Sequence, residues 1–314
     1  MQQKKVLYHP IPSSVAANRS IAFATCSTYP GLAKDDTALA AALSAAGYHV
    51  TPAAWDDPAI DWSRYDAVII RSTWNYHLQP AAFLAWLRQL ESHRLHIANP
   101  VDILEWNMDK KYLKDLENID IPLPPTLFLE KDDNADLDAI FQDTGWQKAV
   151  IKPCISATAY NTWITQPHTA IPDTTTLTRL LDTGSYMIQE YMEEIATDGE
   201  YSLIFFGQQY SHAVKKSAKE GDFRVQEQYG GHSLPTRPDP SIIRQATAIL
   251  DKTIPFDTSP RLLYARVDGV MHKGIFTLME LELVEPSLFF NDNPLAIQQF
   301  VYFFNSSFTA AAIC

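Results

Sequence analysis

The chain has 314 residues, of which 46% are hydrophobic and 20% charged, a composition typical of a folded globular protein and not of a disordered one. The 25 Lys and Arg residues against 37 Asp and Glu residues give a net charge of −12, which argues against nonspecific binding to nucleic acid or to anionic membranes. No apolar run is long enough to span a bilayer, and three widely spaced cysteines without a CxxC pair indicate a reducing compartment. We therefore expect a cytoplasmic protein with two or three domains.

The first hundred residues predict an N-terminal domain of parallel α/β type. Residues 1–20 show no clear periodicity and are expected to form an arm, so the domain is assigned to residues 21–105. Strands are expected at 21–25, 48–52, 66–71 and 96–99, with helices at 38–46 and 81–92. Asp35, Asp36 and Thr37 are candidates to cap the first helix. Strand–helix–strand alternation at these lengths favours a parallel sheet.

The remaining sequence predicts two α+β domains, at residues 106–186 and 187–314. The smaller one is expected to contain a helix at 106–117 and strands at 126–129 and 148–152. The larger one is expected to be rich in strands, at 187–190, 201–206, 209–215, 264–271 and 275–283, with one helix at 241–252. The apolar tail at 300–308 is expected either to pack as a final helix or to contact a second copy in a homodimer.

Three carboxylates suggest a metal site. Glu280 and Glu282 are two residues apart on a predicted strand, so both side chains point to the same face. A hairpin through residues 272–274 would place Asp268 beside them. Carboxylate oxygens are the ligands that Mg²⁺ and Mn²⁺ prefer. A solvated strand face explains the glutamate pair alone equally well, and the third carboxylate favours the metal.

Two lysines and one strand end suggest a nucleotide site. Lys152 ends a buried strand next to a loop of small residues, where it could contact a phosphate, although a strand-end lysine that simply reaches solvent is the commoner case. Lys110, taken alone, is a surface helix residue. The strand that ends in Gln189 and Glu190 could border an adenine, or it could be an ordinary edge strand.

Taken in chain order, these motifs resemble those of the ATP-grasp superfamily. The resemblance covers almost the whole chain from about Ile21 to Phe304. The order is Asp109-Lys110, Ile151-Lys152-Pro153, Gln189-Glu190-Tyr191, Gly199-Glu200, Arg266-Val267-Asp268 and Glu280-Leu281-Glu282. Residues 219–224, followed by Gly230-Gly231, resemble the glutathione-synthetase and ribosomal-protein glutamate-ligase branch. Residues 71–77 and 279–290 are similar to the subgroup with the cyclo-ligase that closes O-ureido-D-serine to D-cycloserine.

The resemblance implies a three-domain ATP-grasp fold in which the central domain is a lid and ATP lies between it and the C-terminal domain. It also implies a role for each matching residue. The nucleotide would be held by Lys110, Lys152, Gln189, Glu190, Tyr191, Met192 and Glu200. Two Mg²⁺ ions, with Mn²⁺ as an alternative, would be held by Asp268, Glu280 and Glu282, where family members often have Asn at the last position. The transferred phosphoryl group and the substrate carboxylate would face Lys215, Arg224 and Arg266.

The resemblance further implies a small, amino-acid-like substrate. Its contacts would come from Arg71, Ser72, Thr73, Asn75, Glu285 and Ser287. Residues 71–77 follow the end of a strand, where open α/β sheets bind ligands. The phosphate flap at 154–161 departs from the family because it contains no glycine.

The implied function is ATP-dependent ligation of a carboxylate to an amine through an acylphosphate, with release of ADP and phosphate. An intramolecular cyclo-ligase is the alternative within enzymes, and a nucleotide-binding protein without ligase activity is the alternative outside them. Other enzyme classes have little support, because the chain lacks the G-x-S-x-G, G-x-G-x-x-G and Walker A motifs. Cys26, at a strand end, is read as a small buried hydrophobe and not as a nucleophile.

Overall fold

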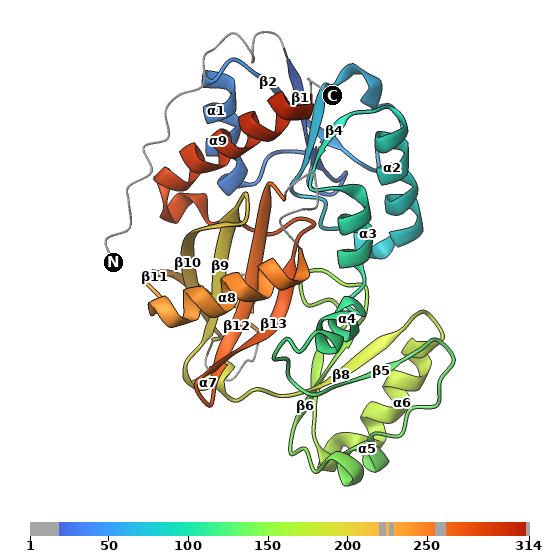
Figure 1. Cartoon of the computed structure of the whole chain (residues 1–314). Helices are drawn as coiled ribbons and strands as arrows, with labels where there is room; N and C mark the ends of the chain where they lie inside the picture. Colours follow the sequence, from blue (N-terminus) through green and yellow to red (C-terminus); the bar gives the residue numbers. More distant parts are fainter. Residues whose placement is uncertain (1–18, 220–223, 226–228, 255–261, 312–314) are drawn as a thin grey trace.

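The computed structural model describes residues 19–219, 224–225, 229–254 and 262–311. The predicted N-terminal arm lies outside the described residues except for Arg19 and Ser20. Three sheets organise the chain, and Figure 1 shows them in a row, with the C-terminal sheet between the other two.

The N-terminal sheet is parallel, with the strand order β2-β1-β3-β4. Its strands are β1 (Ser20–Thr25), β2 (His49–Ala54), β3 (Ala67–Ile70) and β4 (His96–Ala98). Helices α1 (Lys34–Ala45) and α9 (Pro294–Ala311) cover one face, and α2 (Pro80–Ser92) covers the other. Alternation along β1 sends Ile21 and Phe23 to the first face and Ala22 and Ala24 to the second. Both faces are thus buried, which is why the central strands β1 and β3 consist almost entirely of apolar residues.

The middle of the chain forms an antiparallel sheet with the order β5-β8-β6-β7, which we call the lid sheet. Its elements are β5 (Thr126–Leu129), α5 (Leu137–Thr144), β6 (Ala149–Pro153), β7 (Trp163–Thr165), α6 (Ala170–Leu181) and β8 (Tyr186–Glu190). Both helices pack on one face, against Ile151 and Ile188. Alternation therefore turns Lys152 and Gln189 to the opposite face.

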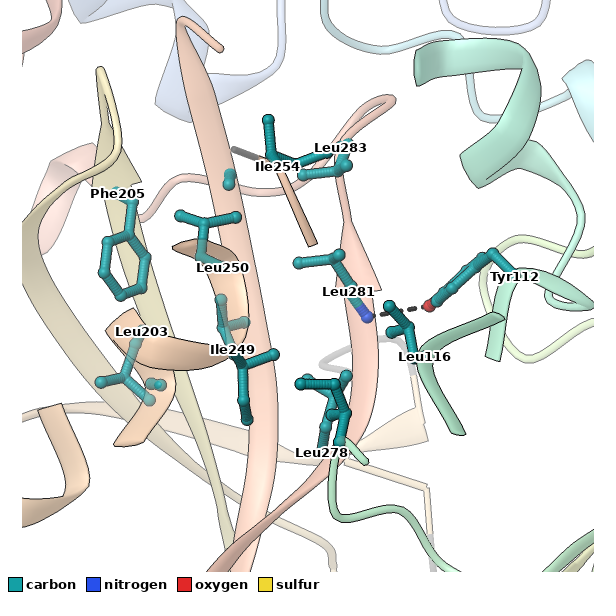
Figure 2. Packing of buried hydrophobic residues seen from close by; sticks show 14 of the residues in the cluster. Tyr112, Leu116, Leu203, Phe205, Ile249, Leu250, Ile254, Leu278, Leu281 and Leu283 are labelled. Atoms are coloured by element: carbon teal, nitrogen blue, oxygen red, sulfur yellow. Dashed lines mark hydrogen bonds between the residues drawn. The ribbon is translucent and has the colours of Figure 1, made fainter. Parts of the chain in front are cut away.

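The C-terminal sheet has five antiparallel strands in the order β11-β10-β9-β12-β13. Its elements are α7 (Glu194–Thr197), β9 (Glu200–Phe206), β10 (Gln209–Ser217), β11 (His232–Thr236), α8 (Pro240–Thr253), β12 (Tyr264–His272) and β13 (Ile275–Glu282). Helix α8 covers one face, where Ile249 and Leu250 pack in the same cluster as Leu203, Phe205 and Leu278 (Figure 2). The other face carries charged side chains and, in the same cluster as the core of the N-terminal sheet, the apolar side chains of Ile204 and Phe206.

Two predictions about helix ends are wrong. The single helix expected at 106–117 is two helices, α3 (Val101–Met108) and α4 (Tyr112–Asn118). Asp109 Oδ1 accepts a hydrogen bond from the Lys111 backbone N–H at 2.9 Å, so this side chain ends one helix and starts the next. Helix α1 begins at Lys34 without a side-chain cap, and Asp36 lies buried inside it.

Helices α3 and α4 close the open edge of the C-terminal sheet. Asn107 donates to Leu281 O and accepts from the Leu283 N–H, both at 2.8 Å. The Tyr112 hydroxyl accepts from the Leu281 N–H at 2.8 Å (Figure 2). These side chains stand in for a neighbouring strand, so the edge that carries Glu280 and Glu282 is fixed in place.

The C-terminal helix is packed inside the chain. Phe300, Phe304 and Phe308 of α9 are buried against the N-terminal sheet and the adjoining end of the C-terminal sheet. The expectation of a packed final helix is confirmed, while the homodimer stays a prediction. None of the helices that the structure describes combines the length and apolarity needed to cross a membrane.

Candidate active site

The β12–β13 hairpin brings four charged side chains together on the face that α8 leaves open. Its register pairs Asp268 with Glu280 and Arg266 with Glu282. The core side chains Val267 and Leu281 alternate with them and face α8. The predicted approach of Asp268 to the two glutamates through this hairpin is therefore confirmed.

An ion-pair network ties these residues to β9 and β10. Arg266 holds Asp268 through Nε–Oδ1 at 2.9 Å and Nη2–Oδ2 at 2.8 Å, and it also contacts Glu282. Lys216 Nζ lies 3.0 Å from Asp268 Oδ2 and 3.2 Å from Glu200 Oε1. Burial alone would raise the pKa of Asp268, but Arg266 and Lys216 hold it well below its usual range. Asp268 therefore stays ionised at every physiological pH.

Lys110 is buried, contrary to the expectation of a surface helix residue. It lies in the break between α3 and α4, where its backbone N–H donates to Cys154 O at 2.8 Å. Its Nζ lies 3.1 Å from Glu280 Oε1 and donates to Ser156 O at 3.0 Å. Burial favours the neutral amine, but Glu280 outweighs it and raises the pKa of Lys110.

Lys152 reaches the same place from the lid sheet. Its Nζ donates to Gln189 Oε1 at 3.3 Å, and within the described parts of the chain no carboxylate lies at ion-pair distance. Burial lowers its pKa, although Glu280 and Glu200 act in the opposite direction. A partly buried ammonium group without a counterion is suited to an incoming anion.

The segment after β8 borders a cavity of about 450 Å³. Glu190, Tyr191 and Met192 line it, together with residues of the β12–β13 turn. The Tyr191 backbone N–H donates to Lys148 O at 3.0 Å, so this amide already has an acceptor. The segment thus connects the lid sheet to the C-terminal sheet, and three of the residues predicted to contact the nucleotide lie along it.

Two residues of the network were missed by the sequence reasoning. Lys216 is buried among Glu200 and Asp268, whereas the predicted Lys215 lies over the ring of Tyr201, 4.8 Å from its centroid. Neighbouring strand residues face opposite ways, so only one of the two lysines can reach the network. Ser202, the second residue missed, donates to Asp268 Oδ1 at 2.6 Å.

The glycine-free flap at residues 154–161 contacts side chains from other parts of the chain. Thr158, Ala159 and Asn161 adopt left-handed backbone conformations, which cost about 1–2 kcal/mol for each residue other than glycine. The Tyr160 ring contacts the His77 ring in a tilted arrangement, with centroids 5.1 Å apart, and the Tyr229 hydroxyl donates to Thr158 O at 3.2 Å. The guanidinium of Arg224, predicted to face the phosphoryl group, lies 3.7 Å from the Tyr229 ring centroid and hence next to this contact.

The predicted substrate residues of the N-terminal sheet serve internal contacts. Arg71 Nε lies 2.7 Å from Asp36 Oδ1, and both side chains are buried. Ser72 Oγ donates to Asp36 Oδ2 at 3.2 Å. Asn75 accepts from Trp55 Nε1 and donates to Asp56, at 2.7 Å in each case, so it joins the loops after β2 and β3. Thr73 is buried as well.

Arg71 also reaches the segment after β13. Its Nη2 donates to Pro286 O at 3.1 Å, and Arg266 Nη1 donates to Ser287 O at 3.2 Å. The two arginines hold this segment beside the charged network. Ser287 is exposed, while Glu285 is partly buried.

The carboxylates are separated by cations in this arrangement. Lys110 pairs with Glu280, and Arg266 lies between Asp268 and Glu282. Among the residues with assigned positions, no three Asp, Glu, His or Cys side chains form a metal-binding group. The donor atoms of these carboxylates are nevertheless the oxygens that Mg²⁺ prefers, so the residue types fit a divalent cation.

Comparisons with known proteins point to one group of enzymes. The sequence model of the N-terminal domain of D-cycloserine synthetase DcsG matches residues 21–99. The cycloserine biosynthesis protein DcsG of Streptomyces lavendulae is 31% identical over 242 residues, which are 74% of this chain and 80% of that relative.

Comparison with solved structures points to the same group of enzymes. The crystal structure of D-cycloserine synthetase DcsG aligns with a TM-score of 0.81 and 26% identity, and the match covers 92% of this chain and 99% of that one. D-alanine–D-alanine ligase from Bacillus anthracis aligns with a TM-score of 0.64 and 14% identity over 95% and 99% of the two chains, which shows a shared fold. The predicted ATP-grasp fold is confirmed, while the exact domain boundaries stay predictions.

Proposed function

This chain belongs to the D-cycloserine synthetase family of ATP-grasp ligases, and on that premise we propose that it forms a C–N bond through an acylphosphate, releasing ADP and phosphate. The single observation that carries the proposal is that Lys152 lies near the Lys110–Glu280 pair. These three residues come from three different parts of the fold. An ammonium group without a counterion beside a carboxylate network suits a nucleotide triphosphate with its cations.

Lys110 and Lys152 are the proposed phosphate ligands. Asp268, Glu280 and Glu282 are the proposed ligands of two Mg²⁺ ions, because they are oxygen donors on adjacent strands. When bound, Mg²⁺ neutralises charge on the phosphoryl oxygens. Approach of the triphosphate would draw Lys110 from Glu280 and leave that carboxylate available.

The chain's own residues then position the acyl group. Arg266 is fixed by Asp268 and is proposed to stabilise the oxyanion that forms when nitrogen attacks the acyl carbon. The flap, held by His77 and Tyr229, would exclude the water that hydrolyses an acylphosphate.

The substrate is proposed to be a small, amino-acid-like carboxylate that faces Glu285 and Ser287. A specific second candidate is intramolecular ligation of O-ureido-D-serine. It is favoured by the match to the N-terminal domain of D-cycloserine synthetase, because that match includes the segment 71–77.

ADP release on a substrate panel tests the proposal. An intermolecular ligase releases ADP only when a carboxylate such as D-alanine is supplied together with an amine. A cyclo-ligase releases ADP with O-ureido-D-serine alone, and a protein without ligase activity releases none with any member. The control is Glu105→Gln, a substitution in an exposed pair with Arg88 that takes no part in the charged network.

A further inference from the structure

The segment from Leu283 to Leu288, which we call the 283–288 loop, is held by its carbonyl groups. Five of its six carbonyl oxygens contact a side chain from elsewhere in the chain. The contacts are Asn99 with Leu283 O (2.7 Å), Tyr264 with Val284 O (2.9 Å), Arg71 with Pro286 O (3.1 Å), Arg266 with Ser287 O (3.2 Å) and His212 with Leu288 O (2.9 Å).

The side chains that hold this loop are all buried, and two are charged. Arg71 is 3% exposed and Arg266 is 6% exposed, and they come from the N-terminal and C-terminal sheets. Loops normally lie on the surface and move, so this degree of anchoring is unusual. Anchoring of this kind is what a functional side chain requires to be presented in a fixed position.

The side chain presented at the remaining position is Glu285. Every other carboxylate of the network has a cationic partner at ion-pair distance: Glu200, Asp268, Glu280 and Glu282. Glu285 has none within the part of the chain that the structure describes, and apart from a hydrogen bond from its own backbone N–H its carboxylate has acceptor capacity left for a ligand. The charged and titratable groups that face it are Lys110, Arg266, Glu280, Tyr76 and Tyr264.

Burial raises the pKa of Glu285 to about 7, and Glu280 adds to the rise while Lys110 opposes it. A base whose pKa lies near the working pH is the most effective proton acceptor, because about half of it is ionised and the ionised form is still basic. Asp268, Glu280 and Glu282 are poorer candidates, because each already accepts from a cationic side chain and each is a proposed Mg²⁺ ligand.

We propose that Glu285 is the general base of the ligation step. The proposal rests on the proposed function, because it requires an acylphosphate and an attacking nitrogen. The nitrogen lone pair forms the C–N bond, the C–O bond to the phosphoryl group breaks, and phosphate leaves with that electron pair. The proton lost by the nitrogen moves to a Glu285 carboxylate oxygen and is then released to phosphate or water.

The proposal predicts different effects of Glu285 on the two halves of the reaction. Formation of the acylphosphate from ATP and the carboxylate needs no proton acceptor, whereas nitrogen attack does. Carboxylate-dependent exchange of the β,γ-bridging oxygen in labelled ATP reports the first half, and product formation reports the second. O-ureido-D-serine, and D-alanine with a second D-alanine, serve as the probes.

In Glu285→Gln we expect oxygen exchange at no less than the wild-type rate, with product formation reduced at least about 100-fold. Glu285→Asp should restore part of the activity and keep the acid limb of the pH–rate profile, which Glu285→Gln should lose. Glu105→Gln should match the wild type in both halves.

Two results would overturn the inference while leaving the proposed function standing: unchanged product formation in Glu285→Gln, or exchange that falls together with product. Absence of both exchange and product formation in the wild type with both probes would overturn the proposed function for these substrates and this inference with it. Near-ultraviolet circular dichroism confirms that each variant is folded before its rates are compared.

Discussion

The buried pair of Arg71 and Asp36 offers a quantitative test of how the N-terminal sheet supports the site. Their side chains are 3% and 2% exposed, and Arg71 Nε lies 2.7 Å from Asp36 Oδ1. An arginine stays protonated, so removing Asp36 leaves a charge in the protein interior. Loss of one partner of a buried ion pair costs about 3–5 kcal/mol. We expect Asp36→Asn to lie near the lower end, because the amide keeps one oxygen acceptor.

Urea unfolding followed by circular dichroism measures this cost. The matched control is Glu105→Gln, whose pair with Arg88 is 40% and 61% exposed and should cost less than about 1 kcal/mol. The double variant Arg71→Met with Asp36→Leu should recover most of the loss, since no unpaired charge remains. If Asp36→Asn costs no more than Glu105→Gln, the reasoning about this pair is wrong.

Three further predictions concern the cleft. Glu280→Gln should abolish turnover while circular dichroism shows an intact fold, because one of three clustered carboxylates is lost; undiminished turnover would remove the metal assignment. Lys216→Met should lower turnover about 100-fold or more, because Lys216 contacts Asp268. Lys215→Met should lower it far less, because Lys215 lies over Tyr201. Equal effects of the two substitutions in the same assay would contradict the placement of Lys216 in the network. The pKa of Glu285 rises from 4.5 to about 7 on folding, so the unfolded chain loses this proton first as the pH rises. The free energy of unfolding of the wild type should therefore fall by about 3 kcal/mol relative to Glu285→Gln across this pH range. Unfolding curves at pH 4 and pH 8 measure the difference between the two proteins, and a difference that does not change with pH would argue against the raised pKa.

The strand pattern of the sequence was sufficient to predict the acidic hairpin. Alternation places Glu280 and Glu282 on one face, and the short turn between β12 and β13 brings Asp268 close to them. The pairing of Asp268 with Glu280 itself depends on a register shift between Asp268 and Gly269, which the sequence does not mark. The parallel N-terminal sheet follows from the alternation of strands and helices along the chain, and the apolar runs of β1 and β3 agree with strands that are covered on both faces. These features depend on local periodicity, which a single sequence contains.

The choice between the neighbouring residues Lys215 and Lys216 depends on strand register. The register between β9 and β10 shifts between Tyr210 and His212, and such an irregularity changes which face later residues of the strand occupy. Nothing in the sequence around Lys215 and Lys216 marks this shift. The resemblance implies Lys215, whereas the register of the folded strand turns Lys216 toward the network, so the role of Lys215 stays a prediction.

Contacts between distant parts of the chain were also hidden. Asp36 was read as a helix cap because it stands near a helix start, but its partner Arg71 lies 35 residues away. Lys110 was read as a surface residue because the break at Asp109 depends on one side-chain hydrogen bond to the backbone. Both cases require knowledge of how the elements pack.

The most direct test of the central claim is to follow oxygen from the substrate carboxylate. The enzyme would be incubated with ATP, Mg²⁺ and ¹⁸O-carboxylate-labelled O-ureido-D-serine or D-alanine with an amine, and the inorganic phosphate would be analysed by mass spectrometry. Attack of the carboxylate on the γ-phosphoryl group predicts one ¹⁸O atom in each phosphate released, in amounts equal to ADP. Phosphate without label, released together with ligated product, would contradict the acylphosphate mechanism.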